Sequence, residues 1–155
     1  MRPIGIGMVA AALAWTACSR APESQITAVE ARIDGITCPT CVPPLQNTLK
    51  RAYAQSTVDV DEATNTATVH FAAGDHFSAS EFRAAVERVR MRVVTFHMEA
   101  CGIVTMADGA AWMSVPGDRL AVRSDRNLPL GKSICATGAL DTRTNPATFQ
   151  IASFK

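Results

Sequence analysis

The chain has 155 residues, of which 48% are hydrophobic and 19% are charged. It is therefore long enough for one ordinary domain or two very small ones, and too apolar for a disordered chain. Its 15 basic and 14 acidic residues nearly cancel, which excludes a protein that binds nucleic acid or anionic lipid through its overall charge.

The first residues differ in kind from the rest. One positive residue, Arg2, precedes an apolar run over residues 4–15, which is shorter than the ~20 residues that a membrane-spanning helix needs. This pattern predicts a signal peptide over residues 1–17 and export to the periplasm or cell envelope. The run ends at Cys18 in a segment that resembles a bacterial lipoprotein signal. The resemblance implies that Cys18 is acylated and anchors the chain in the membrane; an ordinary cleaved signal is the alternative.

Residues 18–25 are polar and contain a proline, which is typical of a short tether. From residue 26 to 98 the hydrophobic period alternates between two and about 3.6 residues. The predicted order is βαββαβ: strand 29–33, helix 42–52, strands 58–61 and 67–71, a helix that a capping box opens at Ser78 and Glu81, and strand 93–98. This order predicts a ferredoxin-like sandwich with both helices on one face of a four-stranded sheet.

After residue 98 the helical period disappears, and short apolar runs alternate with turn residues. Residues 99–155 are therefore predicted to form a small all-β module, with strands at 103–106, 111–115, 120–123, 133–140 and 148–154. A small barrel, for which the OB type is one option, and an extension of the first sheet both fit five such strands. The predicted fold class is α+β: a ferredoxin-like domain over 26–98 followed by this module.

The chemistry of the chain concentrates at the junction between the first strand and the first helix. Cys38 and Cys41 stand three positions apart, a spacing that lets two thiols bind one ion. Unpaired N–H groups at a helix N-terminus favour the thiolate form. Thiolates without nearby histidine or carboxylate select soft ions, so we expect Cu(I) or Hg(II) and not zinc, which normally takes four ligands.

Residues 26–98 resemble a heavy-metal-associated domain, the family of copper chaperones and periplasmic mercury-binding proteins. The family carries Met-x-Cys-x-x-Cys on this loop, and the corresponding segment here runs from Ile36 to Cys41. The resemblance implies that Cys38 and Cys41 are the metal ligands and that Met91 lies against the loop, as an accessory ligand or as a core residue. It also implies a partner, a membrane metal transporter or a detoxification protein, and no enzymatic activity.

Two other interpretations of the Cys-x-x-Cys pair stay open. Thiol-disulfide oxidoreductases use the same spacing at a helix N-terminus, and export makes such an enzyme plausible. A structural disulfide or an inert pair is the third interpretation. No nucleic acid is expected as a partner, and the only expected membrane contact is the lipid anchor.

Cys101 and Cys135 are separated by 34 residues, which is not the spacing of a metal motif. Because export favours oxidation and a small β module benefits from a cross-link, we predict a structural disulfide between them. A second soft-metal site is the alternative.

Overall fold

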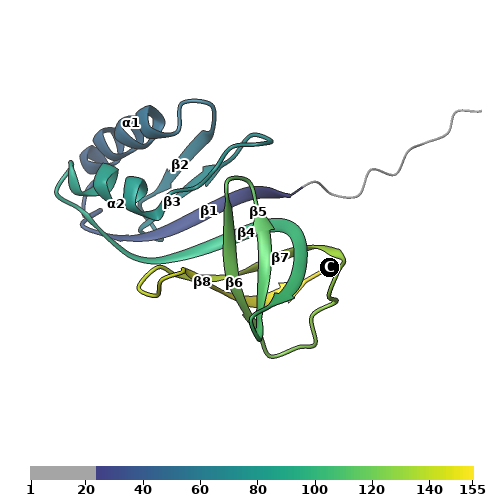
Figure 1. The fold of residues 1–155 in the computed structure, drawn as a ribbon. Helices are drawn as coiled ribbons and strands as arrows, with labels where there is room; N and C mark the ends of the chain where they lie inside the picture. The colour runs from purple at the N-terminus through teal and green to yellow at the C-terminus, as the bar shows by residue number, and fades with distance from the viewer. Residues whose placement is uncertain (1–23) are drawn as a thin grey trace, which may run out of the picture.

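The structure is a computed structural model and describes residues 24–155 (Figure 1). The predicted signal peptide over 1–17, the predicted lipidation site Cys18 and all but the end of the tether over 18–25 lie outside the described residues. Within residues 24–155, no helix has both the length and the apolar character needed to cross a membrane.

Except at β4, which spans two predicted strands, the elements occur where the sequence predicts them, to within a few residues. In chain order they are β1 (Gln25–Asp34), the 3-10 turn η1 (Pro39–Cys41), α1 (Val42–Ala52), β2 (Thr57–Asp61), β3 (Thr66–His70), α2 (Ala79–Glu87), β4 (Arg92–Ala107), β5 (Ala110–Val115), β6 (Asp118–Ser124), β7 (Ser133–Asp141) and β8 (Thr148–Phe154). The strands form one mixed sheet in the order β2-β3-β1-β4-β5-β6-β8-β7, and β7 also pairs with β4.

The predicted fold class, a ferredoxin-like sandwich with a separate β module, is wrong. We expected strands at 93–98 and 103–106 with a boundary between them, but β4 runs through both as a single strand of 16 residues. It pairs with β1 over residues 92–101 and with β7 and β5 over residues 96–107. The residues between 98 and 103 include no proline and no turn sequence, so nothing interrupts the extended backbone. The later strands therefore extend the first sheet.

Both helices cover one face of the sheet formed by β2, β3, β1 and β4 (Figure 1). This face is apolar because β1 alternates, with Val29, Ala31 and Ile33 buried and the residues between them exposed. Each helix contributes one apolar stripe, and α1 buries Leu45 and Leu49 on its stripe. Between the layers lies a cluster of aromatic rings, several of them in edge-to-face contact: Tyr53, Phe71, Phe77, Phe82 and Phe96.

The last five strands close on themselves. β6 and β8 pair in parallel, β8 pairs with β7, and β7 returns to pair with β4. The resulting ring, β4-β5-β6-β8-β7, has no free edge strand and encloses its own apolar residues, among them Val104, Met113 and Phe149.

Two glycines allow strands to approach closely within this ring. A side chain on Gly138 of β7 would overlap the carbonyl group of Gln150 on β8, and one on Gly102 of β4 would overlap the carbonyl oxygen of Ser114 on β5. Neither glycine marks a turn; each is required by the packing of backbone against backbone.

Arg83 ties α2 to the strands beneath it. Its guanidinium donates to the backbone carbonyl of Val93 at 3.4 Å and to the Thr142 hydroxyl at 2.6 Å, and it lies 5.0 Å from the centre of the Phe96 ring. One side chain thus connects the helical layer, β4 and the loop that follows β7.

The environment of Tyr53, the only tyrosine of the chain, predicts a loss of stability at alkaline pH. Burial, reinforced by the negative charge of Glu81, raises the pKa of Tyr53, and its hydroxyl donates to the Ser78 carbonyl at 3.1 Å. The unfolded chain therefore releases the hydroxyl proton of Tyr53 at a lower pH than the folded chain does. The free energy of unfolding falls as pH rises above about 10. We expect tyrosinate absorbance at higher pH in the folded protein than in urea, and a shallower alkaline loss in Tyr53→Phe. Coincident titrations in the two states would contradict this.

Closure of the ring predicts that Gly138→Ala is strongly destabilising. The new methyl group must displace the β8 backbone, which we expect to cost about 2 kcal/mol in chemical denaturation. Thr137→Ala, at the neighbouring position, is the matched control. It loses only the exposed hydrogen bond between the hydroxyl groups of Thr137 and Ser153. Equal losses in the two variants would show that β7 and β8 are not in this close contact.

Candidate functional site

The first cysteine pair lies where β1 gives way to α1. Gly35 turns the chain with φ at 111°, a conformation that favours glycine, and Ile36 enters the core with 4% of its surface exposed. Cys38 then precedes η1, and Cys41 ends η1 and immediately precedes α1. The loop is therefore anchored below by a buried side chain while its cysteines stay near the surface.

The sulfurs of Cys38 and Cys41 are joined in a disulfide, with Cα atoms 5.3 Å apart. Both residues are half-buried, but their surroundings differ. Cys41 packs against the hydrophobic core, whereas the Cys38 sulfur lies 3.2 Å from the hydroxyl oxygen of Thr40. The backbone N–H of Cys41 donates to the Cys38 carbonyl at 2.9 Å, which closes the loop.

The expected N–H donors at the start of α1 are not free. The N–H of Cys41 is bonded to Cys38, that of Val42 donates to the Pro39 carbonyl, and Pro43 and Pro44 have no N–H. The first turn of α1 also holds no acidic residue. Stabilisation of a thiolate here therefore depends on the helix dipole rather than on direct hydrogen bonds from these four residues.

Met91 lies beneath the start of the loop. It is 8% exposed, and a methyl group added to Gly35 would stand 3.2 Å from its Cγ. This position suits a side chain that supports the loop as part of the core. A ligand role for Met91 stays a prediction.

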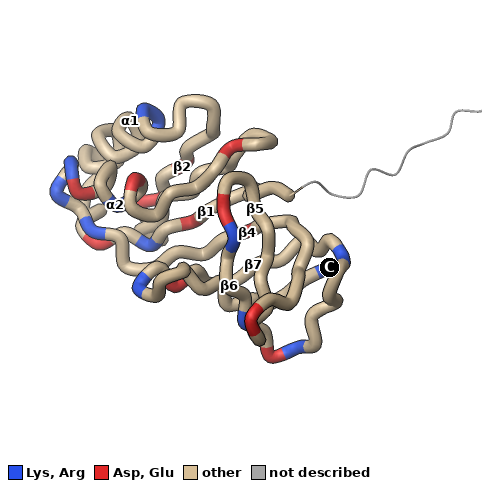
Figure 2. Tube along the Cα trace, viewed as in Figure 1, with Lys and Arg blue, Asp and Glu red and all other residues tan. Residues whose placement is uncertain are grey.

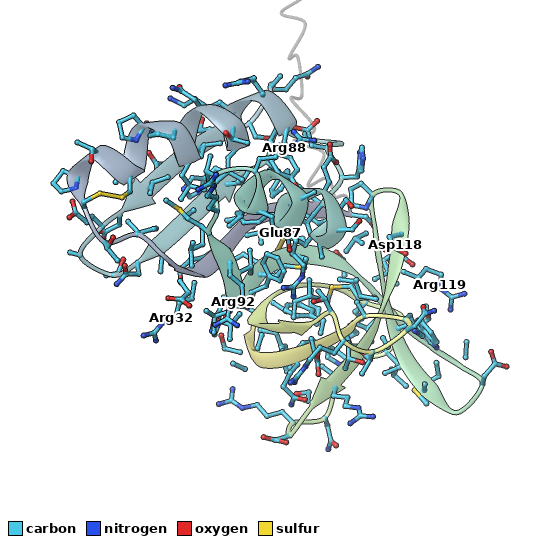
Figure 3. All side chains as sticks on the ribbon, turned by 90° about the vertical axis from the view of Figure 1, so that its left-hand side faces the viewer. Arg32, Glu87, Arg88, Arg92, Asp118 and Arg119 are labelled. Atoms are coloured by element: carbon cyan, nitrogen blue, oxygen red, sulfur yellow. A yellow bond between two sulfur atoms is a disulfide. The ribbon has the colours of Figure 1, made fainter. Side chains whose placement is uncertain are left out.

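The carboxylate of Asp34, the residue directly before Gly35, is already paired. Arg92 donates to the Asp34 carboxylate at 3.1 Å, directly before Gly35, in an exposed ion pair. Figure 3 shows Arg92 and Arg32 projecting on the same side of the sheet. Figure 2 shows blue positions around the C-terminal end of α2, where Arg88 and Arg90 follow Glu87.

The described part of the chain gathers no larger group of metal-ligating side chains. Among residues 24–155, no three His, Cys, Asp or Glu side chains are close enough together to hold a metal ion. When reduced, the two sulfurs of Cys38 and Cys41 are by themselves a donor set that suits an ion accepting two soft ligands.

The second cysteine pair lies elsewhere, on the seam that closes the ring. Cys101 of β4 and Cys135 of β7 are directly opposite each other, with Cα atoms 3.9 Å apart, and their sulfurs form a disulfide. Both residues are half-buried.

A groove that the sequence analysis did not predict lies on the sheet face opposite the helices. This groove encloses about 470 Å³, and its lining includes Glu30, His70, His97 and Glu99. Glu30 and His97 become neighbours only through the pairing of β1 with β4. No spacing along the chain indicates that pairing.

Comparison of the chain with protein-family models, curated proteins and solved structures finds no significant match. Membership of the heavy-metal-associated family therefore stays a prediction, based only on the sequence of this chain.

The contact between Gly35 and Met91 predicts that Gly35→Ala destabilises the loop. The substitution combines a backbone conformation that costs an L-residue about 1–2 kcal/mol with crowding against Met91. Gly74→Ala is the matched control, because Gly74 has a φ of 87° and nothing within 4 Å of the added methyl group. We expect a larger loss of unfolding free energy for Gly35→Ala. If Gly74→Ala costs as much, Met91 does not support the loop.

Proposed function

We propose that this chain is an exported binding protein that captures a soft metal ion, Cu(I) or Hg(II), with the thiolates of Cys38 and Cys41. The observation that carries the proposal is the juxtaposition of two half-buried sulfurs on a surface loop at the start of α1. A pair of thiolates without a nearby histidine or free carboxylate is a soft, two-coordinate donor set.

Metal uptake begins from the reduced pair. A thiol reductant supplies two electrons and two protons to the Cys38–Cys41 disulfide and produces two thiols. Hg(II) then replaces both thiol protons and forms two metal–sulfur bonds; Cu(I) binds in the same way. Cys38, the less enclosed of the two, is the sulfur that a partner thiolate reaches first during transfer.

The remaining parts of the proposal concern the destination of the ion. A lipid at Cys18 would keep the chain at the membrane, within reach of a metal transporter or a detoxification protein. Exchange between cysteines of the two proteins moves the ion without a catalytic step, so we propose no enzymatic activity.

One observation favours a second candidate function. Cys38 and Cys41 are joined in a disulfide; both are half-buried, but only Cys41 packs on the hydrophobic core. An oxidoreductase uses such an arrangement, because its outer thiolate attacks a substrate and its inner thiol resolves the mixed disulfide. The two functions differ in whether the reduced pair holds a metal ion or exchanges disulfides rapidly.

The proposal predicts one soft ion per chain. In a background with Cys18, Cys101 and Cys135 replaced by serine, the reduced protein should bind one Cu(I) or one Hg(II) in native mass spectrometry. Cys38→Ser in this background should weaken binding by more than about a hundredfold, because one of two ligands is lost. Zn(II) should bind weakly, because two more ligands are absent from the site.

Thr40→Ala is the matched control, because it changes the loop but removes no sulfur; circular dichroism verifies folding of each variant. Failure of the reduced, folded protein to retain either soft ion would refute the metal function. Rapid exchange with a model disulfide by the same protein would then favour the oxidoreductase.

A further inference from the structure

We propose that Cys101 and Cys135 form, when reduced, a second dithiol site for a soft metal ion on the outer wall of the five-stranded ring. The site uses no residue of the Cys38–Cys41 loop, so it can be tested independently of the proposed function. Such a site requires that the two sulfurs stay together without their own bond.

The pairing of β4 with β7 does not depend on the disulfide. Eight residue pairs join the two strands in register, from Phe96 with Leu140 to Ile103 with Ser133. The side chains that alternate inward on both strands, including Ala100, Ala136 and Ile134, are buried in the ring. Reduction removes a cross-link from strands that their own hydrogen bonds and core contacts already align. Cys101 and Cys135 therefore remain neighbours as thiols.

The register also directs the two side chains toward the same place. Cys135 exchanges both backbone hydrogen bonds with Lys155, at 3.1 and 3.0 Å, on the β8 side of β7. Its pair with Cys101 is consequently of the non-hydrogen-bonded kind, in which opposed side chains come closest. In such pairs the Cβ atoms are about 4.5–5.5 Å apart. Each sulfur is one bond from its Cβ and turns about the Cα–Cβ bond, so the two sulfurs can separate to the distance of about 4.6 Å that two metal–sulfur bonds of about 2.3 Å span.

The environment of the pair is also suitable. Cys101 and Cys135 occupy the outer face of the ring, because the residues that flank each of them along its strand are buried inside or point inward: Ala100 and Gly102 on β4, and Ile134 and Ala136 on β7. Reductant and metal can reach both half-buried sulfurs.

Binding of a metal ion at this pair takes two steps. A thiol or phosphine reductant supplies two electrons, and two protons are taken up as the sulfur–sulfur bond breaks. Hg(II) then displaces both protons and forms one bond to each sulfur. Oxidation of the pair reverses the first step, so the redox state of the surroundings would set whether this second site exists.

The test uses the full chain with Cys18, Cys38 and Cys41 replaced by serine, which leaves only Cys101 and Cys135. After reduction with a phosphine and anaerobic desalting, Hg(II) is titrated against excess glutathione. We expect one Hg(II) per chain, loss of two protons in native mass spectrometry and thiolate-to-mercury absorbance in the near ultraviolet. Amides of β4 and β7 should keep their protection against hydrogen exchange throughout.

The matched control keeps two thiols but misplaces one. In the same background, Cys135→Ser with Thr137→Cys moves the second thiol to the position opposite Glu99, diagonal to Cys101 and about 7–8 Å away between Cα atoms. We expect its affinity for Hg(II) to be at least about tenfold lower, because the ligands are no longer preorganised. Equal affinity in the two variants, no retention of Hg(II) against glutathione, or loss of exchange protection on reduction would each overturn the proposal.

Discussion

The pairing of β4 on both of its edges is the constraint on which the rest of the structure depends. Over residues 92–101 this strand is hydrogen-bonded to β1 and completes the sheet that the helices cover, and from residue 96 onward it is bonded to β7 and then β5. The backbone of residues 96–101 is thus held on both sides. The helical layer and the ring cannot separate without breaking one of these ladders. This makes a single continuous sheet out of what the hydrophobic pattern presents as two parts.

The two cysteine pairs occupy different kinds of position in that sheet. Cys38 and Cys41 are on a loop, where the chain leaves β1 and enters a helix, and their neighbourhood is defined by local turns and by Ile36 and Met91 below. Cys101 and Cys135 are on paired strands, and their neighbourhood is defined by register. A loop pair can change its sulfur separation through small backbone rotations, whereas a cross-strand pair keeps the separation that the ladder imposes. The first is suited to exchange with a partner, and the second to retention.

Two effects that usually occur together at a helix N-terminus are separated in this loop. The N–H groups of Cys41 and Val42 are already bonded, and prolines occupy positions 43 and 44. The helix dipole remains, but direct hydrogen bonds from these residues to a sulfur anion do not. For a soft ion this matters little, because the metal itself stabilises both thiolates. For a redox enzyme it matters more, since a free thiolate must be stabilised without a metal. This difference favours the proposed capture of a metal ion over thiol catalysis.

The sequence by itself determined the local features of this protein. Alternation in β1, the apolar stripes of the helices and the capping box at Ser78, whose side chain accepts from the Glu81 N–H, all follow from contacts between near neighbours in the chain. The spacing of Cys38 and Cys41, three residues apart at a strand–helix junction, is equally local. Tertiary structure alone decided that residues 93–98 and 103–106 belong to one strand, that β7 returns to β4, and in which register the predicted pair of Cys101 and Cys135 meets. Those outcomes depend on which strand edges meet and in which register, and hydrogen-bonding edges are alike in every strand. Hydrophobic pattern specifies which face of a strand is buried, but not which partner its edge will find.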